Sequence, residues 1–360
     1  MKILISSISG HDKTTTPHCI RVLERMGHEI VFVSTPNYSH GSVEETLADG
    51  FLPDTPLADL IQRYGVFDLF LYIEPGGLIP VGIENAPFPT ACWISDVHQG
   101  VEQRKRLARF FDYVFLYHRN HLKYFSEHPA TQIQWIPYAC DLDLFYPRIV
   151  DKTYDIAFIG QIAITEERKR IFPVLQSKWK LNEQKYYFQN EIPDIYSKGK
   201  IVINLPIGDD LNFRTFEALS CGTLLLTRGM DNGMDLLFEE NKHYVAFVDE
   251  QELLEKIEYY LNHDEERETI AAQGLEEIRR CHRLENRLET ILAAVTGGLA
   301  SGAPIRSMNQ TGCDNQYAWL YEYWRMADPG LTLIKRAKSA KRSWMPLTFP
   351  VIRTMLRTIR

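Results

Sequence analysis

The sequence lacks the residue patterns that mark secreted, metal-binding and membrane-spanning proteins. Its six cysteines are scattered over 360 residues, with no C-x-x-C pair and no histidine at ligand spacing from them. Neither a disulfide framework nor a zinc site is therefore expected. No apolar run approaches the roughly 18–20 residues that a membrane-spanning helix needs, and residues 1–5 are too short for a signal sequence. These absences favour a cytoplasmic protein that holds no metal.

The glycine-rich motifs of nucleotide-binding enzymes are missing as well. The loop at residues 9–16 and the loop after the apolar run 155–159 each contain one glycine, so neither forms a G-x-G-x-x-G fingerprint. The sequence also contains no G-x-x-x-x-G-K-[ST] phosphate loop, no H-E-x-x-H and no G-x-S-x-G. Nicotinamide and flavin enzymes are thereby disfavoured, and a dehydrogenase is only a distant alternative.

The composition is that of a folded globular protein. Hydrophobic residues make up 45% of the chain and charged residues 24%, which excludes disordered and fibrous classes. At roughly 150 residues per domain, the length suggests two domains. The net charge of −7 is uneven, because residues 331–360 carry eight basic side chains and no acidic one, which leaves about −15 on the rest. The acidic body argues against a nucleic-acid partner.

Short apolar runs alternate with helical patterns along most of the chain, which is typical of α/β domains with doubly wound parallel sheets. The expected strands lie at residues 3–5, 30–33, 69–73, 91–94, 113–116, 135–138, 155–159, 201–205, 223–227 and 245–248. A long charged helical stretch follows at about 265–295. We predict two Rossmann-like domains, 1–147 and 148–298, and a basic helical tail, 299–360.

The tail allows two interpretations. Its last ten residues place an apolar stripe on one side of a helix and three arginines off that stripe. The stripe either packs back on the N-terminal domain, which we favour, or lies on an anionic membrane surface on the cytoplasmic side.

Residues 212–227 are the most informative segment. They predict a loop, a helix from about Thr215, a stop at Gly222 and a buried strand. A helix N-terminus offers unpaired N–H groups and a partial positive charge, so this one suits a diphosphate. The alternative is that Glu217, in the first turn, only stabilises the start of the helix.

This segment carries a resemblance to a known family. Residues 214–222, the strand after them, residues 249–253 and the helix at 274–287 resemble the C-terminal domain of GT-B-fold glycosyltransferases, most closely the CgeB-like spore-maturation group. The likeness is strongest over residues 155–292 and mostly architectural before residue 147. It implies a donor domain at the C-terminal side and an acceptor domain at the N-terminal side of a cleft.

The resemblance also implies a donor site. In retaining relatives, a glutamate at the place of Glu217 binds the nucleotide ribose, and an acid eight residues earlier contacts the donor sugar. That earlier place holds Asp209, with Asp210 beside it, so the usual glutamate is absent. Two acids here can bind sugar hydroxyls or belong to a solvated loop. No metal or other cofactor is expected, because cationic side chains and helix dipoles neutralise the diphosphate.

The cations should lie near the glycine turn at Gly160. The CgeB-like pattern places an arginine at the start of the next helix, and Arg168 is the best match. A guanidinium binds phosphate oxygens bidentately. Arg214 and Asn212 are further candidates for the diphosphate. The base is expected near residues 188–193.

Candidates on the acceptor side follow two predicted strands. Glu74 ends one of them, and Asp96 and His98 come after the next. The carboxyl ends of parallel strands face the ligand site, so these residues are candidates for acceptor binding or acid–base catalysis. His98 is a general base if the enzyme inverts, whereas a retaining enzyme uses such residues to position substrates. Each one can instead make a loop-stabilising hydrogen bond.

Together these patterns predict an enzyme, a glycosyltransferase that moves a sugar from a nucleotide-diphosphate sugar to a hydroxyl acceptor. The expected reaction needs no metal and retains the anomeric configuration. A catalytically silent GT-B nucleotide-binding or scaffold protein is the alternative from another class. A GT-B nucleotide-sugar epimerase or a phosphorylase is the alternative among enzymes.

Overall fold

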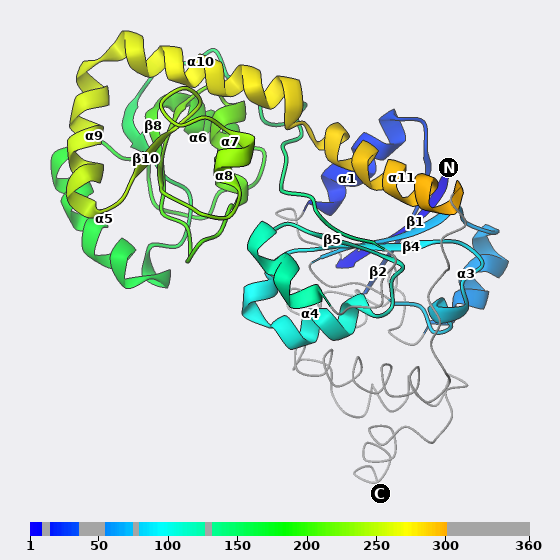
Figure 1. The fold of residues 1–360 in the computed structure, drawn as a ribbon. Coiled ribbons are helices and arrows are strands. Elements are labelled where there is room, and N and C mark those ends of the chain that lie inside the picture. The colour runs from blue at the N-terminus through cyan, green and yellow to red at the C-terminus, as the bar shows by residue number, and fades with distance from the viewer. Residues whose placement is uncertain (9–14, 36–54, 75–78, 127–131, 301–360) are drawn as a thin grey trace, which may run out of the picture. The chain divides into compact units, whose positions relative to one another are not determined.

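The computed structural model describes residues 1–8, 15–35, 55–74, 79–126 and 132–300. Their contacts divide them into two compact units. The first contains Met1–Tyr117, His121–Trp135 and the residues from Ile291 onward, and the second contains His118–Asn120 and Ile136–Thr290. Each unit has its own parallel sheet (Figure 1).

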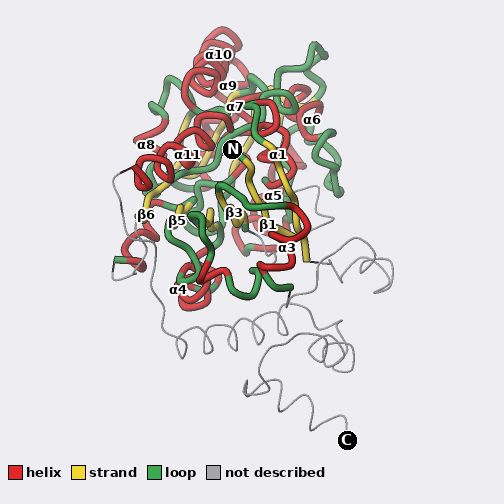
Figure 2. Tube along the Cα trace, turned by 90° about the vertical axis from the view of Figure 1, so that its right-hand side faces the viewer, coloured by secondary structure: helices red, strands yellow, loops and turns green. Residues whose placement is uncertain are grey.

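The first sheet has six parallel strands in the order β2-β1-β3-β4-β5-β6. The strands are β1 (Lys2–Ile8), β2 (Glu29–Thr35), β3 (Leu69–Ile73), β4 (Thr90–Ile94), β5 (Tyr113–Leu116) and β6 (Gln132–Trp135). The helices of this unit include α1 (Thr16–Arg25), α3 (Leu57–Tyr64), α4 (Val101–Ala108), the three-residue turns η1 (Ile83–Asn85) and η2 (Val97–Gln99), and η3 (Arg119–Phe125). Figures 1 and 2 place α1 and α11 (Leu284–Ala300) over one face of the sheet and α3 and α4 over the other.

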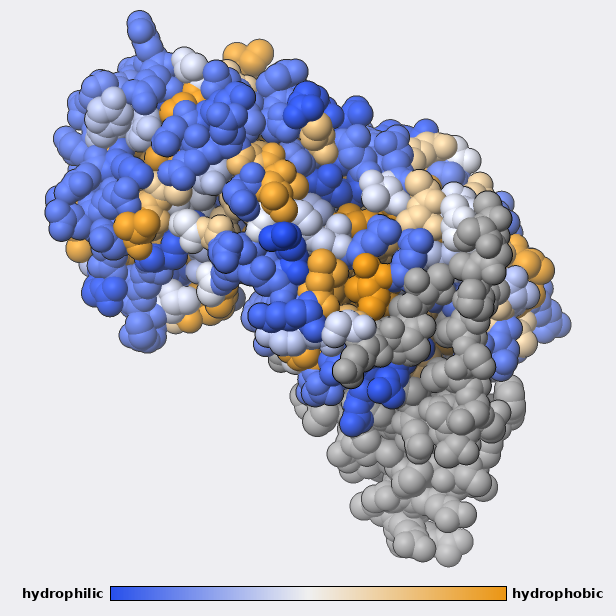
Figure 3. Space-filling view, in the orientation of Figure 1, coloured by the Kyte–Doolittle hydropathy of each residue, from blue (hydrophilic) through white to orange (hydrophobic). Residues whose placement is uncertain are grey.

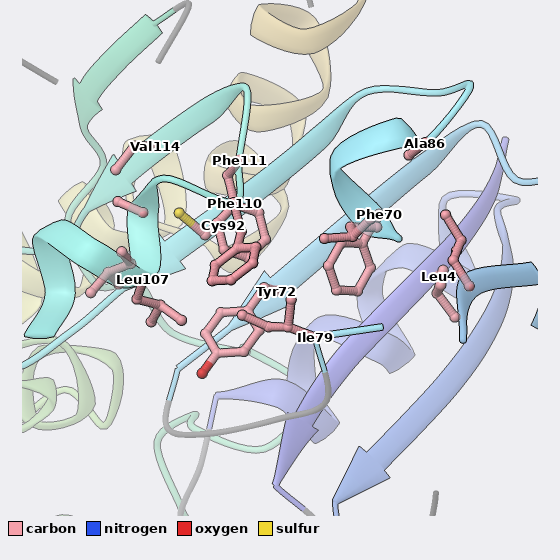
Figure 4. Packing of buried hydrophobic residues seen from close by; sticks show 14 of the residues in the cluster. Leu4, Phe70, Tyr72, Ile79, Ala86, Cys92, Leu107, Phe110, Phe111 and Val114 are labelled. Carbon is pink, nitrogen blue, oxygen red and sulfur yellow. The ribbon is translucent and has the colours of Figure 1, made fainter. Parts of the chain in front are cut away.

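Helices on both faces explain why the central strands are apolar along their length. Every residue of β3 and β4 is buried. On one face, the Phe111 ring lies 5.9 Å from the Phe70 ring and 5.5 Å from the Tyr72 ring, centroid to centroid (Figure 4). This cluster anchors the strand ends that carry the polar candidates of the first unit.

The second sheet has four parallel strands in the order β10-β9-β8-β7. The strands are β7 (Tyr154–Ala157), β8 (Gly199–Asn204), β9 (Leu224–Arg228) and β10 (Val245–Phe247). The helices are η4 (Ile162–Ile164), α5 (Glu166–Lys178), α6 (Ile192–Lys198), α7 (Phe213–Ser220), α8 (Met234–Leu237), α9 (Glu250–Asn262) and α10 (Asp264–Cys281). Helix α10 packs against α7 and β9. A Cβ atom at Gly274 of α10 would lie 2.6 Å from the His243 carbonyl oxygen, so this close approach requires glycine.

Two element predictions are wrong. The sixth strand, expected at 135–138, is Gln132–Trp135, because Pro137 has no N–H group to donate to a neighbouring strand. The helix expected over 265–295 is two helices, α10 and α11. Between them the Cys140 N–H donates to the His282 carbonyl (3.2 Å) and the Cys140 carbonyl accepts from the Leu284 N–H (2.9 Å). A distant segment therefore supplies the hydrogen bonds that a continuous helix would make itself.

The limits of the two units differ from the domain boundaries that the sequence predicted at residues 147 and 298. Residues 136–147 belong with the second unit, where Cys140 bridges the start of α11. Residues 291–300 belong with the first unit, where the Tyr113 hydroxyl donates to the Val295 carbonyl (3.4 Å). The basic tail, from residue 301, lies outside the described residues, and so do both interpretations of its stripe.

Within the described ranges, no helix is both long and apolar enough to cross a membrane. The face drawn in Figure 3 is mainly hydrophilic, with apolar residues in small groups. Exposed large apolar residues such as Val66, Ile149 and Val248 are scattered over different elements.

Candidate functional site

Asn204, at the carboxyl end of β8, is the centre of a polar network in the second unit. Its side chain is fully buried. Oδ1 accepts from Nη1 of Arg214 (2.8 Å) and from Nδ2 of Asn212 (3.2 Å), while Nδ2 donates to the Thr227 hydroxyl (3.2 Å). The structure thus brings together Asn212 and Arg214, two of the predicted diphosphate ligands. Sequence reasoning missed Asn204, although a polar residue that ends an apolar strand was the signal.

The glycine turn after β7 makes room for the Arg214 guanidinium. The group lies over the Phe158 ring, 4.5 Å from its centroid, and donates to the Ile159 carbonyl. A Cβ atom at Gly160 would lie 2.7 Å from Nη2 of Arg214. Gly160 and Arg214, both predicted from the sequence, therefore lie in direct contact.

Two helices begin beside this edge of the sheet, and their N-termini differ. Asn212 is the N-cap residue of α7, but its side chain makes no capping bond, and the first turn holds no acidic residue. In α5, the Thr165 hydroxyl accepts from the Arg168 N–H (3.2 Å), and Glu166 and Glu167 occupy the first turn. An anion is therefore favoured at the start of α7 and disfavoured at the start of α5.

Arg168 lies in the interior of the second unit, with 4% of its surface exposed. Its Nε donates to the Leu205 carbonyl (3.1 Å) and its Nη1 to the Gln161 carbonyl (2.9 Å). Burial, and then the nearby Arg214, lower the pKa of Arg168 to about 10. The guanidinium ties the loop after β7 to the end of β8, and its contact with phosphate stays a prediction.

Glu217 lies on the second turn of α7, because the helix begins at Phe213, two residues earlier than predicted. Burial raises the pKa of Tyr196 and of Cys221, and the charge of Glu217 raises both further. The carboxylate is thus near the α6 side of α7. Its contact with a ribose stays a prediction.

Asp209 and Asp210 contact other residues of the same unit. The Asp209 carboxylate accepts from Nδ2 of Asn120 (2.7 Å) and from the Asp231 N–H (2.8 Å). Asp210 Oδ1 lies 2.9 Å from Nε2 of His118, a histidine with 1% of its surface exposed. The sequence analysis singled out neither His118 nor Asn120. Their position just after the strand at 113–116 was the available signal.

In the first unit, Glu74 and Asp96 lie at the carboxyl ends of β3 and β4. Glu74 is buried, with its Oε1 2.9 Å from Nη2 of Arg104. Burial raises the pKa of Glu74 to about 7, against the lowering effect of Arg104. Asp96 has φ 45° and ψ 30°, the left-handed region that non-glycine residues rarely adopt. The structure therefore places both predicted acids at one edge of the first sheet.

His98, the third candidate of this unit, is exposed on η2. Its ring centroid lies 6.0 Å from that of His121. Burial, and then His98, lower the pKa of His121 to about 4. The imidazoles of His98 and His121 therefore lie near each other, and the sequence analysis named only His98.

No cluster of three or more His, Cys, Asp or Glu side chains suited to a metal ion occurs among the described residues. The arrangement at the second sheet instead offers a guanidinium and an uncapped helix start, which are groups that bind phosphate oxygens. Independence from metal stays a prediction.

Comparisons with known proteins give one family match and several likenesses of fold. Residues 152–293 match the family model "Glycosyl transferase-like". The fold is similar to that of a sucrose-phosphate synthase from Thermosynechococcus elongatus (14% identity, TM-score 0.54, covering 83% of this chain and 99% of that one). It is also similar to HepE from Anabaena (13%, TM-score 0.59, 82% and 100%) and to a glycosyltransferase from Rickettsia africae (11%, TM-score 0.58, 83% and 98%). No curated protein sequence matches the chain.

These likenesses confirm the predicted fold and the enzyme class, while the CgeB-like grouping is not confirmed. At 11–14% identity, the solved structures show the fold alone. The family match coincides with the unit that holds Arg214, Asn212 and Gly160. The chain has the GT-B fold, and its residues 152–293 match the glycosyltransferase-like family.

Proposed function

We propose that the chain transfers a sugar from a nucleotide-diphosphate sugar to a hydroxyl acceptor without a divalent metal. The observation that carries the proposal is the uncapped start of α7 beside the Arg214 guanidinium, within the segment that matches the family. Backbone N–H groups and a planar cation at one place suit the two phosphates of the donor.

The leaving diphosphate gains negative charge as the sugar departs. Arg214 and the partial positive charge of α7 stabilise that charge, so that no metal ion is needed. Arg168 holds the surrounding loops through the carbonyls of Leu205 and Gln161. Glu217 is the proposed ribose ligand.

A uridine nucleotide is the first donor to test. HepE, which shares the fold, is known in complex with UDP, with UDP and glucose, and with UDP-glucose. The proposal therefore starts from UDP-sugars and extends to other nucleotides only if these fail.

The test is release of UDP from UDP-glucose by the purified protein in EDTA, with a panel of hydroxyl acceptors and with water alone. We expect UDP release in EDTA and a glycosylated product with the natural acceptor. Protein that binds UDP but never turns over UDP-glucose in any of these mixtures would contradict the proposal.

A catalytically silent nucleotide-binding protein is the second candidate. The contacts that Asp209 and Asp210 make within the protein favour it. The Asp209 carboxylate accepts two hydrogen bonds within the second unit, and Asp210 Oδ1 lies 2.9 Å from His118 Nε2, where relatives present an acid to the donor sugar. This candidate predicts UDP binding without turnover. An epimerase would convert the donor sugar without transfer, and a phosphorylase would require free phosphate.

Because Asp209 and Asp210 contact other residues of the unit, neither takes the place of the acid that contacts the donor sugar in retaining relatives. The stereochemical course is therefore not part of this proposal. Peripheral membrane contact through residues 331–360 is a separate proposal, supported by their eight basic and no acidic side chains. Co-sedimentation with anionic and with neutral vesicles tests it, and equal binding to both would contradict it.

A further inference from the structure

Asn204 is a polar residue in an apolar part of the second unit. It ends β8 after three buried aliphatic residues, 201–203, and its own side chain is 0% exposed. A carboxamide offers two N–H donors and an oxygen with two lone pairs. All four are used, because Oδ1 accepts from two side chains and Nδ2 donates to two hydroxyls. A leucine of similar size would break all of these hydrogen bonds.

The partners of this amide lie on two sides. Nδ2 donates to the hydroxyls of Thr227 (3.2 Å) and Thr215 (3.4 Å), and both threonines are fully buried. Oδ1 accepts from Arg214 (2.8 Å) and Asn212 (3.2 Å), which are half-buried at the start of α7. A guanidinium can only donate, so the amide oxygen is fixed on this side. The core thus holds Asn204, and Asn204 holds the two predicted phosphate ligands.

The groups around the Arg214 guanidinium are neutral. Besides Asn204, it contacts the Ile159 carbonyl and the Phe158 ring, and Tyr196 is nearby. The arginine ion pairs found among the described residues do not include Arg214. No neighbouring carboxylate therefore neutralises the charge of this guanidinium, and the uncharged amide of Asn204 preserves it.

The guanidinium also keeps N–H groups for a ligand. It has five of them. The bonds to Asn204 and to the Ile159 carbonyl start from its two terminal nitrogens, each of which carries a second N–H. Groups of this kind bind phosphate oxygens. The bond to Asn204 therefore restrains the guanidinium without using up its donors.

Resting on the proposed function, we propose that Asn204 is a positioning residue for the donor diphosphate. Its carbonyl oxygen holds the Arg214 guanidinium in the orientation that binds phosphate. Its lack of charge leaves the guanidinium to pair with the diphosphate. Asn204 acts through Arg214 and touches no substrate. Neither leucine nor aspartate can replace it, because leucine removes the oxygen and aspartate adds a competing charge.

The test is a double-mutant cycle, read by calorimetric titration of UDP in EDTA. The proteins compared are wild type, Asn204→Leu, Arg214→Met and the double variant. We expect Asn204→Leu to bind UDP about tenfold more weakly than wild type, because the guanidinium loses its orientation. In the Arg214→Met background the same change should weaken binding less than about threefold. The full tenfold loss in both backgrounds, or wild-type affinity in folded Asn204→Leu, would overturn the positioning role.

Asn204→Asp separates positioning from a merely structural role. Aspartate is close to asparagine in shape and keeps an oxygen for Arg214, so a structural role predicts that it disturbs UDP binding less than leucine does. The positioning role predicts the reverse order, because the new carboxylate pairs with the guanidinium and repels the diphosphate. We expect UDP binding to weaken about 100-fold. UDP affinity equal to or higher than that of Asn204→Leu would overturn the proposal.

Thr227→Val and Thr223→Val form a matched pair that leaves Asn204 in place. The Thr227 hydroxyl accepts from Asn204, whereas the equally buried Thr223 hydroxyl donates to the Tyr196 carbonyl (2.8 Å). Both variants lose one buried hydrogen bond and should melt at a lower temperature. Only Thr227→Val should weaken UDP binding, by about threefold, because it loosens the amide of Asn204. Equal UDP affinity in the two variants would count against the proposal.

Failure of the proposed function gives a different result. Wild type would then not bind UDP, or wild type and Arg214→Met would bind it equally. Either result removes the diphosphate site on which the role of Asn204 rests.

Discussion

At the scale of single residues, two arginines with similar sequence signals have different environments. Arg168 is buried and donates to two main-chain carbonyls. Arg214 is half-buried at an uncapped helix start and donates to the Ile159 carbonyl and to Asn204. The sequence indicated both as phosphate ligands, because a position near the start of a helix does not reveal how deeply the guanidinium is buried. The proposed function therefore uses Arg214, the more exposed of the two, for the diphosphate and Arg168 for holding the loops.

Replacement of Arg168 by methionine should therefore act mainly on stability. The change leaves the Leu205 and Gln161 carbonyls without their donor, which we expect to cost about 2–3 kcal/mol. Urea unfolding of the variant and wild type measures this difference. Unchanged stability, with UDP affinity reduced as strongly as by loss of Arg214, would contradict the assignment.

Gly160→Ala tests the contact between the glycine turn and Arg214. The new Cβ atom would lie 2.7 Å from Nη2, which is the end of a flexible side chain, so the guanidinium should move while the fold persists. We expect UDP affinity to fall by about tenfold, or ~1.4 kcal/mol. Gly229→Ala is the control, because its Cβ would meet nothing closer than 4.0 Å. Equal UDP affinity in both variants would contradict this account.

At the scale of elements, two glycines in helices have opposite predicted effects. A Cβ atom at Gly274 of α10 would lie 2.6 Å from the His243 carbonyl oxygen and 2.8 Å from Cδ2 of Leu219, whereas one at Gly297 of α11 meets nothing within 4 Å. We expect Gly274→Ala to destabilise the protein by about 1–3 kcal/mol. Gly297→Ala should stabilise it by about 0.5–1 kcal/mol, because alanine is the better helix former. Thermal unfolding of both variants checks the two signs.

Most elements could be predicted because the strands are covered on both faces and are therefore continuous apolar runs. The exceptions depend on distant residues. The end of α10 depends on the hydrogen bonds of Cys140, far earlier in the chain. The strand β6 has the half-buried sequence Gln132–Trp135, so its pattern was weaker than that of the buried strands.

At the scale of the whole molecule, the ends of parallel strands indicated the candidates of the first unit. The rule that polar residues after parallel strands face ligands indicated Glu74 and Asp96 from the sequence alone. The same rule, applied to the strand at 113–116, would have found His118. It could not supply Arg104, which contacts Glu74 from a helix 30 residues later. Pairings of this kind depend on the three-dimensional fold.

Both units have their own sheet and buried core, and the family match falls within the second. The central claim is that this unit holds the diphosphate of a nucleotide sugar at Arg214 and the start of α7. Its failure would remove the basis of the proposed reaction, whatever the first unit binds.

The most direct measurement is calorimetric titration of UDP into wild type, Arg214→Met and Arg170→Met in EDTA. Arg170 is the control arginine, since it is exposed and paired with Glu250. We predict that wild type and Arg170→Met bind UDP equally, and that Arg214→Met binds about 10- to 100-fold more weakly, from the loss of a charged hydrogen bond worth about 1.5–3 kcal/mol. Equal affinity in all three proteins, or no binding by wild type, would contradict the account.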